Sequence, residues 1–179
     1  MCTLCVEILI FCIEFIKDGV YMKRKIIPYI ISVAISLGVG IISALLTREN
    51  MNIYEEVSTP PLSPPSFLFP VVWTVLYVLM GISAAMVLTT GTSPLTQRKE
   101  ALTVYGLSLI FNFFWSIIFF NIRAFLFAFI WLIALLALII LTIVRYSRIN
   151  KTAAYLQIPY ALWVTFAGYL NFGIWLLNR

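Results

Sequence analysis

The residues of this sequence whose types and spacing could do chemistry are aromatic rings and one amide, all placed in long uncharged stretches. Trp73 and Tyr77 are four residues apart, and Asn112 precedes Trp115 by three residues. Side chains at these spacings share one face of a helix, and Trp163 lies on another such face later in the chain. Aromatic walls with one or two fixed hydrogen-bonding groups suit a flat, conjugated, hydrophobic molecule. Together these faces predict a ligand pocket, although each face alone is more typical of ordinary helix packing.

Other kinds of chemistry lack the residues that they need. The sequence has no histidine, and its three cysteines, Cys2, Cys5 and Cys12, all lie near its beginning. Cys2 and Cys5 have the spacing of a metal or redox pair, but no second pair or histidine completes it. A haem iron also finds neither a histidine nor a cysteine ligand in the rest of the chain. We therefore expect no metal site and no cofactor, and a porphyrin would be a ligand without axial ligation.

The composition places these residues in a membrane. Hydrophobic residues make up 63% of the 179 residues and charged residues 11%, against about 45–50% and about 25% in soluble domains. A helix crosses the hydrocarbon core with about 20 apolar residues, and lipid offers no partner to an open backbone. We predict an all-α integral membrane protein, a bundle of five transmembrane helices. The spans lie near residues 26–46, 67–88, 101–120, 124–144 and 153–177.

None of the five predicted spans contains Asp, Glu, Lys or Arg. Ionisable residues inside a membrane mark ion pathways and proton relays, so their absence argues against an ion channel, a pump or an ion-coupled transporter.

Lysine and arginine predict the orientation, because loops on the cytoplasmic side carry more of them. With the N-terminus in the cytoplasm, eight of those from residue 22 onward lie inside: Lys23, Arg24, Lys25, Arg98, Lys99, Arg145, Arg148 and Lys151. Only three, Arg48, Arg123 and Arg179, lie outside, so we expect the C-terminus outside. In a cell with one membrane this is a plasma-membrane protein. The net charge of +5 then reflects topology, and a nucleic-acid partner is not expected.

Residues 1–21 do not fit a sixth span. The stretch is apolar, but Glu7 and Glu14 interrupt it, and it lacks the basic start and small-residue cleavage site of a signal peptide. We interpret it as an extended start, translated ahead of the true one at Met22, or as an interfacial helix. Residues 22–179 then form the five-helix domain.

Four prolines, Pro60, Pro61, Pro64 and Pro65, precede the second span. Proline fixes φ and donates no backbone hydrogen bond, so this segment is expected to be stiff and non-helical. It lies in the outer loop before the helix of Trp73. It is either a stiff connector between two spans or a preformed rim of the pocket, and its aromatic neighbours favour the rim.

Three long segments carry a resemblance to a known family. They are PPLSPPSFLFPVVWTVLYVLMG (60–81), ALTVYGLSLIFNFFWSIIFF (101–120) and IPYALWVTFAGYLNFGIWLLN (158–178). In this order and with five spans, they resemble the TspO/MBR family, the tryptophan-rich sensory proteins related to the mitochondrial translocator protein or peripheral benzodiazepine receptor. The resemblance covers about residues 26–177. It implies a five-helix bundle, often a homodimer, that binds porphyrins such as protoporphyrin IX in a pocket under the first long loop.

The resemblance also implies roles for single residues. Trp73 and Trp163 look like the pocket tryptophans, and they are the candidates for any catalytic role in porphyrin breakdown. Asn112 looks like the pocket amide, Ala167 like the small residue of the wall, and Tyr54 like the loop tyrosine that closes over the ligand. Tyr77 and Trp115 complete the expected ligand-binding set, and the four prolines form its lid.

Two positions depart from the family pattern. Leu62 and Ile53 stand where members often have tryptophan, so the lid is less aromatic here. The sterol motif expected near the end of the fifth helix is also incomplete, because the first basic residue after Tyr169 is Arg179. Sterol binding is therefore not expected.

Four functions remain open. The first is a membrane receptor or sensor that binds tetrapyrroles and modulates their level or transport. The second is an enzyme that degrades porphyrins with light and oxygen through the pocket tryptophans. The third is a transporter of hydrophobic metabolites without ion coupling, and the fourth is a structural assembly partner with no pocket.

Overall fold

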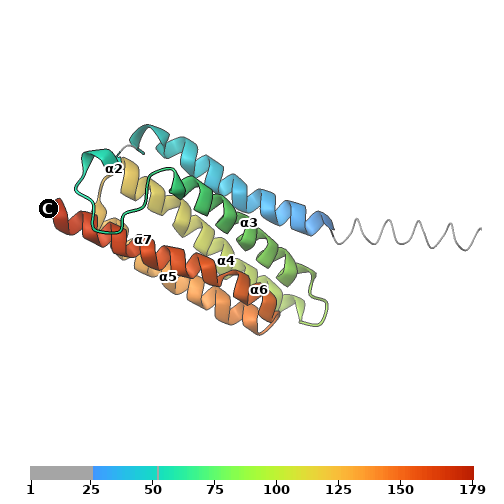
Figure 1. Cartoon of the computed structure of the whole chain (residues 1–179). Helices are drawn as coiled ribbons and strands as arrows, with labels where there is room; N and C mark the ends of the chain where they lie inside the picture. Colours follow the sequence, from blue (N-terminus) through green and yellow to red (C-terminus); the bar gives the residue numbers. More distant parts are fainter. Residues whose placement is uncertain (1–25, 52) are drawn as a thin grey trace, which may run out of the picture.

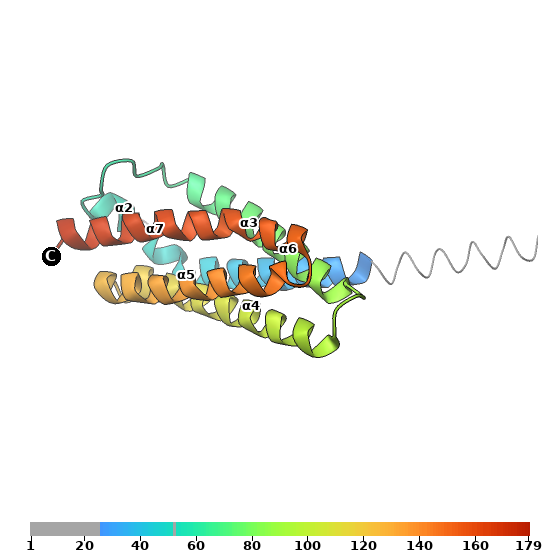
Figure 2. The ribbon, with the colours of Figure 1, turned by 90° about the horizontal axis from the view of Figure 1, so that it is seen from below.

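The computed structural model describes residues 26–51 and 53–179, except for the side chains of residues 54 and 55. Within these residues the chain forms long helices that lie side by side, and no strand occurs among them (Figures 1 and 2). The elements are a first helix over residues 26–47, η1 (Arg48–Asn50), α2 (Ile53–Glu56), α3 (Leu68–Thr89), α4 (Leu95–Ser116), the π-helical turn η2 (Ile117–Asn121), α5 (Phe125–Ser147), α6 (Lys151–Leu156) and α7 (Ile158–Leu177). Residues 1–21, the predicted extension, lie outside this description.

In the part of the chain that the structure describes, five helical stretches are long and apolar enough to cross a membrane. They are Ile26–Asn50, Leu68–Thr89, Leu95–Asn121, Phe125–Ser147 and Lys151–Leu177, with lengths of 22 to 27 residues. Each exceeds the roughly 20 residues that the hydrocarbon core requires. The predicted fold class, an all-α bundle of five transmembrane helices, is confirmed, and the protein is an integral membrane protein.

Two helices differ from the predicted spans, one in where it begins and one in its continuity. The third begins at Leu95 instead of residue 101, directly after the extended Pro94, because its charged first turns continue the helix beyond the apolar segment. The fifth is broken at Gln157 into α6 and α7. Pro159 follows the break, and its missing amide hydrogen cannot complete the bond to the carbonyl four residues earlier.

Small residues let the first helix approach α3 and α4 closely. A Cβ atom on Gly40 would overlap the ring of Tyr77, and one on Gly81 would overlap the backbone of Val33. Between these points the hydroxyls of Ser36 and Tyr105 lie 2.7 Å apart in a buried hydrogen bond. Close packing and hydrogen bonds hold membrane helices together, because lipid supplies little hydrophobic driving force.

The segment that carries the four prolines lies at the same end of the bundle as the C-terminus (Figure 1). We call this the loop end. The turn from η2 to α5 reaches the same end, where the Arg123 guanidinium and the Glu56 carboxylate form an ion pair of 2.9 Å. Asn121 also donates to the Leu46 carbonyl, at 3.0 Å. The loop end is thus tied together by polar contacts, while the rest of the bundle is mainly apolar.

Candidate ligand-binding site

A cavity opens among the first helix, α3 and α4 toward the loop end. Its volume is about 100 Å³, and it is lined by Gly40, Ser43, Ala44, Thr47, Met51, Phe69, Pro70, Trp73, Tyr77, Trp115, Ser116 and Phe120. Helical spacing explains how the α3 residues reach it, because Phe69, Trp73 and Tyr77 lie one turn apart on one face. Three of the predicted ligand-binding residues, Trp73, Tyr77 and Trp115, line this cavity together.

Trp73 is the centre of an aromatic cluster beside the cavity. Its ring centroid lies 5.6 Å from that of Tyr77, 6.5 Å from that of Trp115 and 6.2 Å from that of Tyr160. Trp115 in turn stacks on Phe119 at 5.4 Å. These separations are typical of favourable ring pairs. The cluster brings together residues of α3, α4, η2 and α7 that are far apart in the sequence.

Asn112 finds its partner within this cluster. Its side-chain Nδ2 donates to the Tyr77 hydroxyl at 2.8 Å, and the Asn112 side chain is buried. An amide left without a partner in an apolar interior is costly, so this bond fixes the rotation of α4 against α3. Gly40 of the first helix leaves room for the Tyr77 ring of α3, because a Cβ atom at residue 40 would overlap that ring.

Trp163 lies behind the cavity wall, and Ala167 does not line the cavity. The ring of Phe69, which lines the cavity, meets the ring of Trp163 edge-on at 5.9 Å. Ala167 is buried on the same face of α7 as Tyr160 and Asn171. A ligand in the cavity would therefore reach Trp163 only if Phe69 moved.

Several buried polar atoms of α4 and α7 have no hydrogen-bond partner among the described residues. They are the indole Nε1 atoms of Trp115 and Trp163, the Tyr160 hydroxyl, and both side-chain amide atoms of Asn171. Three more such groups, on Arg98, Tyr146 and Gln157, lie away from the loop end. Native proteins leave few buried polar groups unpaired, and each one calls for an explanation by water, an ion or a ligand.

The segment with the four prolines covers the loop end of α7. Pro60 is buried and packs so closely on Gly173 that a Cβ atom at residue 173 would come within 2.7 Å of its ring. The Pro61 carbonyl accepts a hydrogen bond of 2.7 Å from the Tyr169 hydroxyl. Pro64 and Pro65 continue the segment toward α3, and the Pro65 carbonyl accepts from the amide of Leu68. The side chain of Tyr54, the predicted closing residue, lies outside the described part of the chain.

A reciprocal pair of hydrogen bonds ties the loop to the end of α7. The Ser58 amide donates to Asn178 Oδ1, and Asn178 Nδ2 donates to the Ser58 carbonyl, both at 2.9 Å. We call the Asn178 and Tyr169 contacts with the loop the latch. No local sequence pattern predicts the latch, because Ser58 and Asn178 are 120 residues apart. Phe69 was missed too, although its position four residues before Trp73 was a usable signal.

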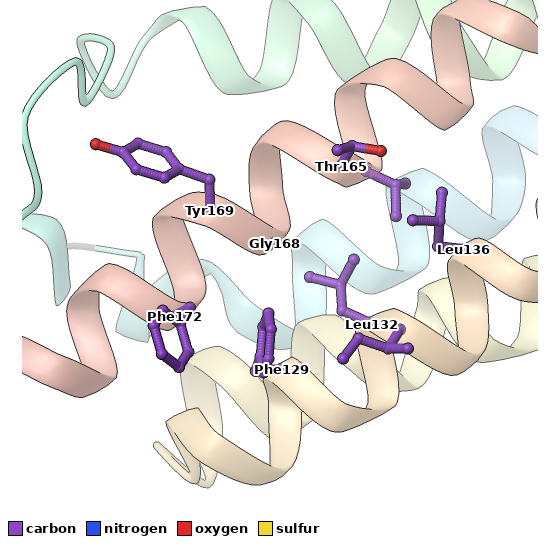
Figure 3. A pocket seen from close by; sticks show the side chains of 9 residues that line it. Phe129, Leu132, Leu136, Thr165, Gly168, Tyr169 and Phe172 are labelled. Atoms are coloured by element: carbon purple, nitrogen blue, oxygen red, sulfur yellow. The ribbon is translucent and has the colours of Figure 1, made fainter.

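Two other hollows are larger, but they open on the outside of the bundle. One lies between α5 and α7, with a volume of about 270 Å³ (Figure 3). The other lies between the first helix and α4, with a volume of about 420 Å³. Their walls are almost wholly apolar, and the aromatic cluster around Trp73 does not line them. The smaller inner cavity is therefore the candidate ligand site, because aromatic rings and polar groups converge there.

Fold and site together define an integral membrane protein of five helices with a tryptophan-rich interior. The chain belongs to the TspO/MBR family, whose model matches residues 32–176. The resemblance carried by the three sequence segments is thereby confirmed. The roles of single residues in ligand binding stay predictions.

Proteins from several kinds of organism are similar in sequence to this chain over most of its length. The tryptophan-rich protein TspO of Chlorobaculum tepidum is 33% identical over 158 residues, covering 88% of this chain and 99% of that protein. The tryptophan-rich sensory protein of Cereibacter sphaeroides is 30% identical over 125 residues, covering 70% and 76%. The translocator protein of Bos taurus is 30% identical over 145 residues, covering 80% and 85%.

Proposed function

We propose that this protein is a membrane receptor or sensor that binds porphyrins and similar flat hydrophobic molecules in the aromatic interior, and thereby modulates tetrapyrrole level or transport. The observation that carries the proposal is a set of buried polar atoms on α4 and α7 that have no partner among the described residues. Trp115 Nε1, Trp163 Nε1, the Tyr160 hydroxyl and the Asn171 amide are all buried without a partner among the described residues. A ligand with acceptor atoms would satisfy the N–H and O–H groups, and a donor on the ligand would satisfy Asn171 Oδ1.

The chemistry of these groups describes the ligand. An indole N–H only donates hydrogen bonds, while a hydroxyl and an amide both donate and accept. No Lys or Arg lines the described cavity, so the interior suits neutral acceptors, such as ring nitrogens or carbonyls. Carboxylates of a porphyrin would have to remain at the loop end, where Arg123 lies at the surface.

The described cavity represents a closed form of the site. Its volume of about 100 Å³ is well below the roughly 300–1,000 Å³ of pockets that hold drug-sized ligands. Binding therefore needs Phe69 to turn away, which would join the cavity to Trp163 and the unpartnered groups of α7. The latch ties the loop to α7, and in this proposal the loop releases before the ligand enters. The prolines limit how many conformations the released loop can take, which lowers the entropy lost when it closes again.

The orientation predicted from charge belongs to this proposal. With the N-terminus in the cytoplasm, the loop end faces outward, and in a cell with one membrane the ligand would enter from outside. A homodimer is compatible with this arrangement, because the site lies within one bundle.

Titration with protoporphyrin IX tests the proposal. The purified full chain is reconstituted in lipid, and tryptophan fluorescence is followed in the dark. We expect saturable quenching in the wild type and its loss in both Trp73→Phe and Trp163→Phe. The matched control is Trp131→Phe, because Trp131 stacks on Phe111 at 4.4 Å on another side of α4 and should leave binding unchanged.

The outcomes separate the candidate functions. Unchanged quenching in both tryptophan variants would refute the site, and no quenching in the wild type would favour a structural partner. A new bilin-like absorbance that requires light, oxygen and both tryptophans would show the degrading enzyme instead. Flux of porphyrin across vesicles without an ion gradient would show uncoupled transport.

A further inference from the structure

The groove between α5 and α7 lies on the outer surface of the bundle, apart from the inner site. Figure 3 shows Leu132 and Leu136 of α5 pointing toward α7, with Phe129 and Phe172 at one end. The groove extends over residues 129–136 of α5 and residues 164–172 of α7. At 1.5 Å per residue, seven steps along α5 correspond to about 10 Å. The groove is thus an elongated hollow that runs along the helices.

Glycine at position 168 leaves this groove empty. A Cβ atom there would meet only Phe129 Cε2, at 3.9 Å, which is an ordinary contact distance. The hydroxyl of Thr165, which also lines the groove, already donates to the Ala161 carbonyl at 2.8 Å. Ile133 and Phe172 are 53% and 40% exposed, so the groove opens outward. In a five-helix membrane protein this face meets the hydrocarbon of the bilayer.

We propose that this groove binds one acyl chain of a bilayer lipid, and that the bound chain holds Tyr169 in the position that latches the loop. The walls offer no free polar group among the described residues, so the occupant must itself be apolar. A whole helix of a second copy, about 10–12 Å across with its side chains, does not fit between α5 and α7, because these two helices pack directly against each other. A single hydrocarbon chain has the right shape, and the bilayer supplies it at this surface.

Tyr169 links the groove to the loop. Its ring lines the groove, and Figure 3 shows its hydroxyl turned away from the groove toward the loop. That hydroxyl donates to the Pro61 carbonyl at 2.7 Å. A chain packed beside the ring restricts its rotation and keeps the bond formed, whereas an empty groove leaves the ring free to turn. Lipid binding to the groove does not depend on the proposed function. Only the role of the latch in ligand entry rests on the proposed function.

Photolabelling tests the lipid site. The full chain is placed in phosphatidylcholine vesicles that contain a lipid with a photoreactive diazirine in its acyl chain, and labelled peptides are mapped by mass spectrometry. We expect label to concentrate on residues 129–136 and 164–172, and Gly168→Leu to reduce it there about tenfold, since the new side chain fills the groove. Gly106→Leu is the matched control, because Gly106 lines the other outer groove and a Cβ atom there meets nothing within 4 Å. Label spread evenly over the surface, or unchanged by Gly168→Leu, would refute the site. If Gly168→Leu does not fold, Gly168→Ala gives the same test with a smaller reduction.

Hydrogen exchange tests the link to the latch. Exchange of the amides of residues 57–59, 62 and 63 is compared in nanodiscs of straight-chain phosphatidylcholine and of its methyl-branched phytanoyl counterpart, whose wider chains do not enter the groove. We expect exchange to be about fivefold slower with straight chains, the factor that corresponds to one neutral hydrogen bond. The difference should vanish in Gly168→Leu and in Tyr169→Phe, and persist in Gly106→Leu. Equal exchange of the wild type in both lipids, or the same lipid dependence in all variants, would refute the coupling. Neither experiment uses a porphyrin, so its failure is distinct from a failure of the proposed function.

Discussion

The hydrogen bond between Asn112 and Tyr77 should be worth a measurable part of the stability of the bundle. Tyr77→Phe removes only the hydroxyl and keeps the ring that packs on Gly40 and beside Trp73. It leaves Asn112 Nδ2 without its partner at 2.8 Å, in a site where Asn112 is 1% exposed. A buried group left unpaired costs about 1–3 kcal/mol. Hydrogen bonds between membrane helices average about 0.6 kcal/mol and reach about 1.7 kcal/mol, so we expect a loss of about 1 kcal/mol in the free energy of unfolding.

A double-mutant cycle isolates this bond. Asn112→Leu keeps a similar side-chain size, and the double variant Tyr77→Phe/Asn112→Leu removes both polar groups. The double variant should be less destabilised than the sum of the single variants, by about 0.6–1.7 kcal/mol. Unfolding is followed by tryptophan fluorescence during titration with dodecyl sulfate in mixed micelles. Tyr155→Phe is the control, because Tyr155 is 65% exposed and its change should stay within about 0.5 kcal/mol.

One result would contradict the reasoning directly. If Tyr77→Phe and Asn112→Leu were additive within error, the two side chains would not be coupled, and the Asn112 amide would have another partner. The inferred rotation of α4 against α3 would then lose its physical basis, and the geometry of the cavity wall would need revision.

Two further predictions use glycines that the structure distinguishes sharply. Gly40→Ala should destabilise the bundle by about 1–3 kcal/mol through overpacking against Tyr77. Gly38→Ala has nothing within 4 Å of the new Cβ atom and should be neutral in the same micelle titration. Equal effects of the two variants would contradict the close approach of the first helix to Tyr77. Gly173→Ala should displace Pro60 and speed amide exchange over residues 57–63, because the new Cβ atom would come within 2.7 Å of the Pro60 ring. Unchanged exchange would show that the loop does not pack on α7.

The architecture could be predicted from the sequence because the membrane leaves few choices. Charge-free stretches of about 20 residues can only be helices that cross the bilayer, so the five spans followed from where the charged residues lie. The helix ends were less accurate, since charged residues such as Arg98 can continue a helix outside the hydrocarbon. The break at Gln157 depends on Pro159, which the sequence displayed but whose effect on a membrane helix varies with its neighbours.

The aromatic and amide residues of the inner site could also be selected in advance, and the structure places several of them together. Helical spacing alone aligned Trp73 with Tyr77 and placed Asn112 near Trp115. It could not show that Phe69 separates Trp163 from the cavity, because that depends on side-chain rotamers of two different helices. The assignment of ligand-binding roles to these residues stays a prediction until the titration is done.

The sequence by itself determined that this chain is a five-helix membrane protein with an uncharged, tryptophan-rich interior, since hydrophobicity and charge act locally along the chain. Only the tertiary structure decided which polar groups pair and which remain without a partner. Asn112 meets Tyr77, and Asn178 meets Ser58 from 120 residues away, whereas Asn171 meets no partner among the described residues. The rotation of each helix about its axis makes these choices, and it is set by the packing of the whole bundle rather than by any local pattern.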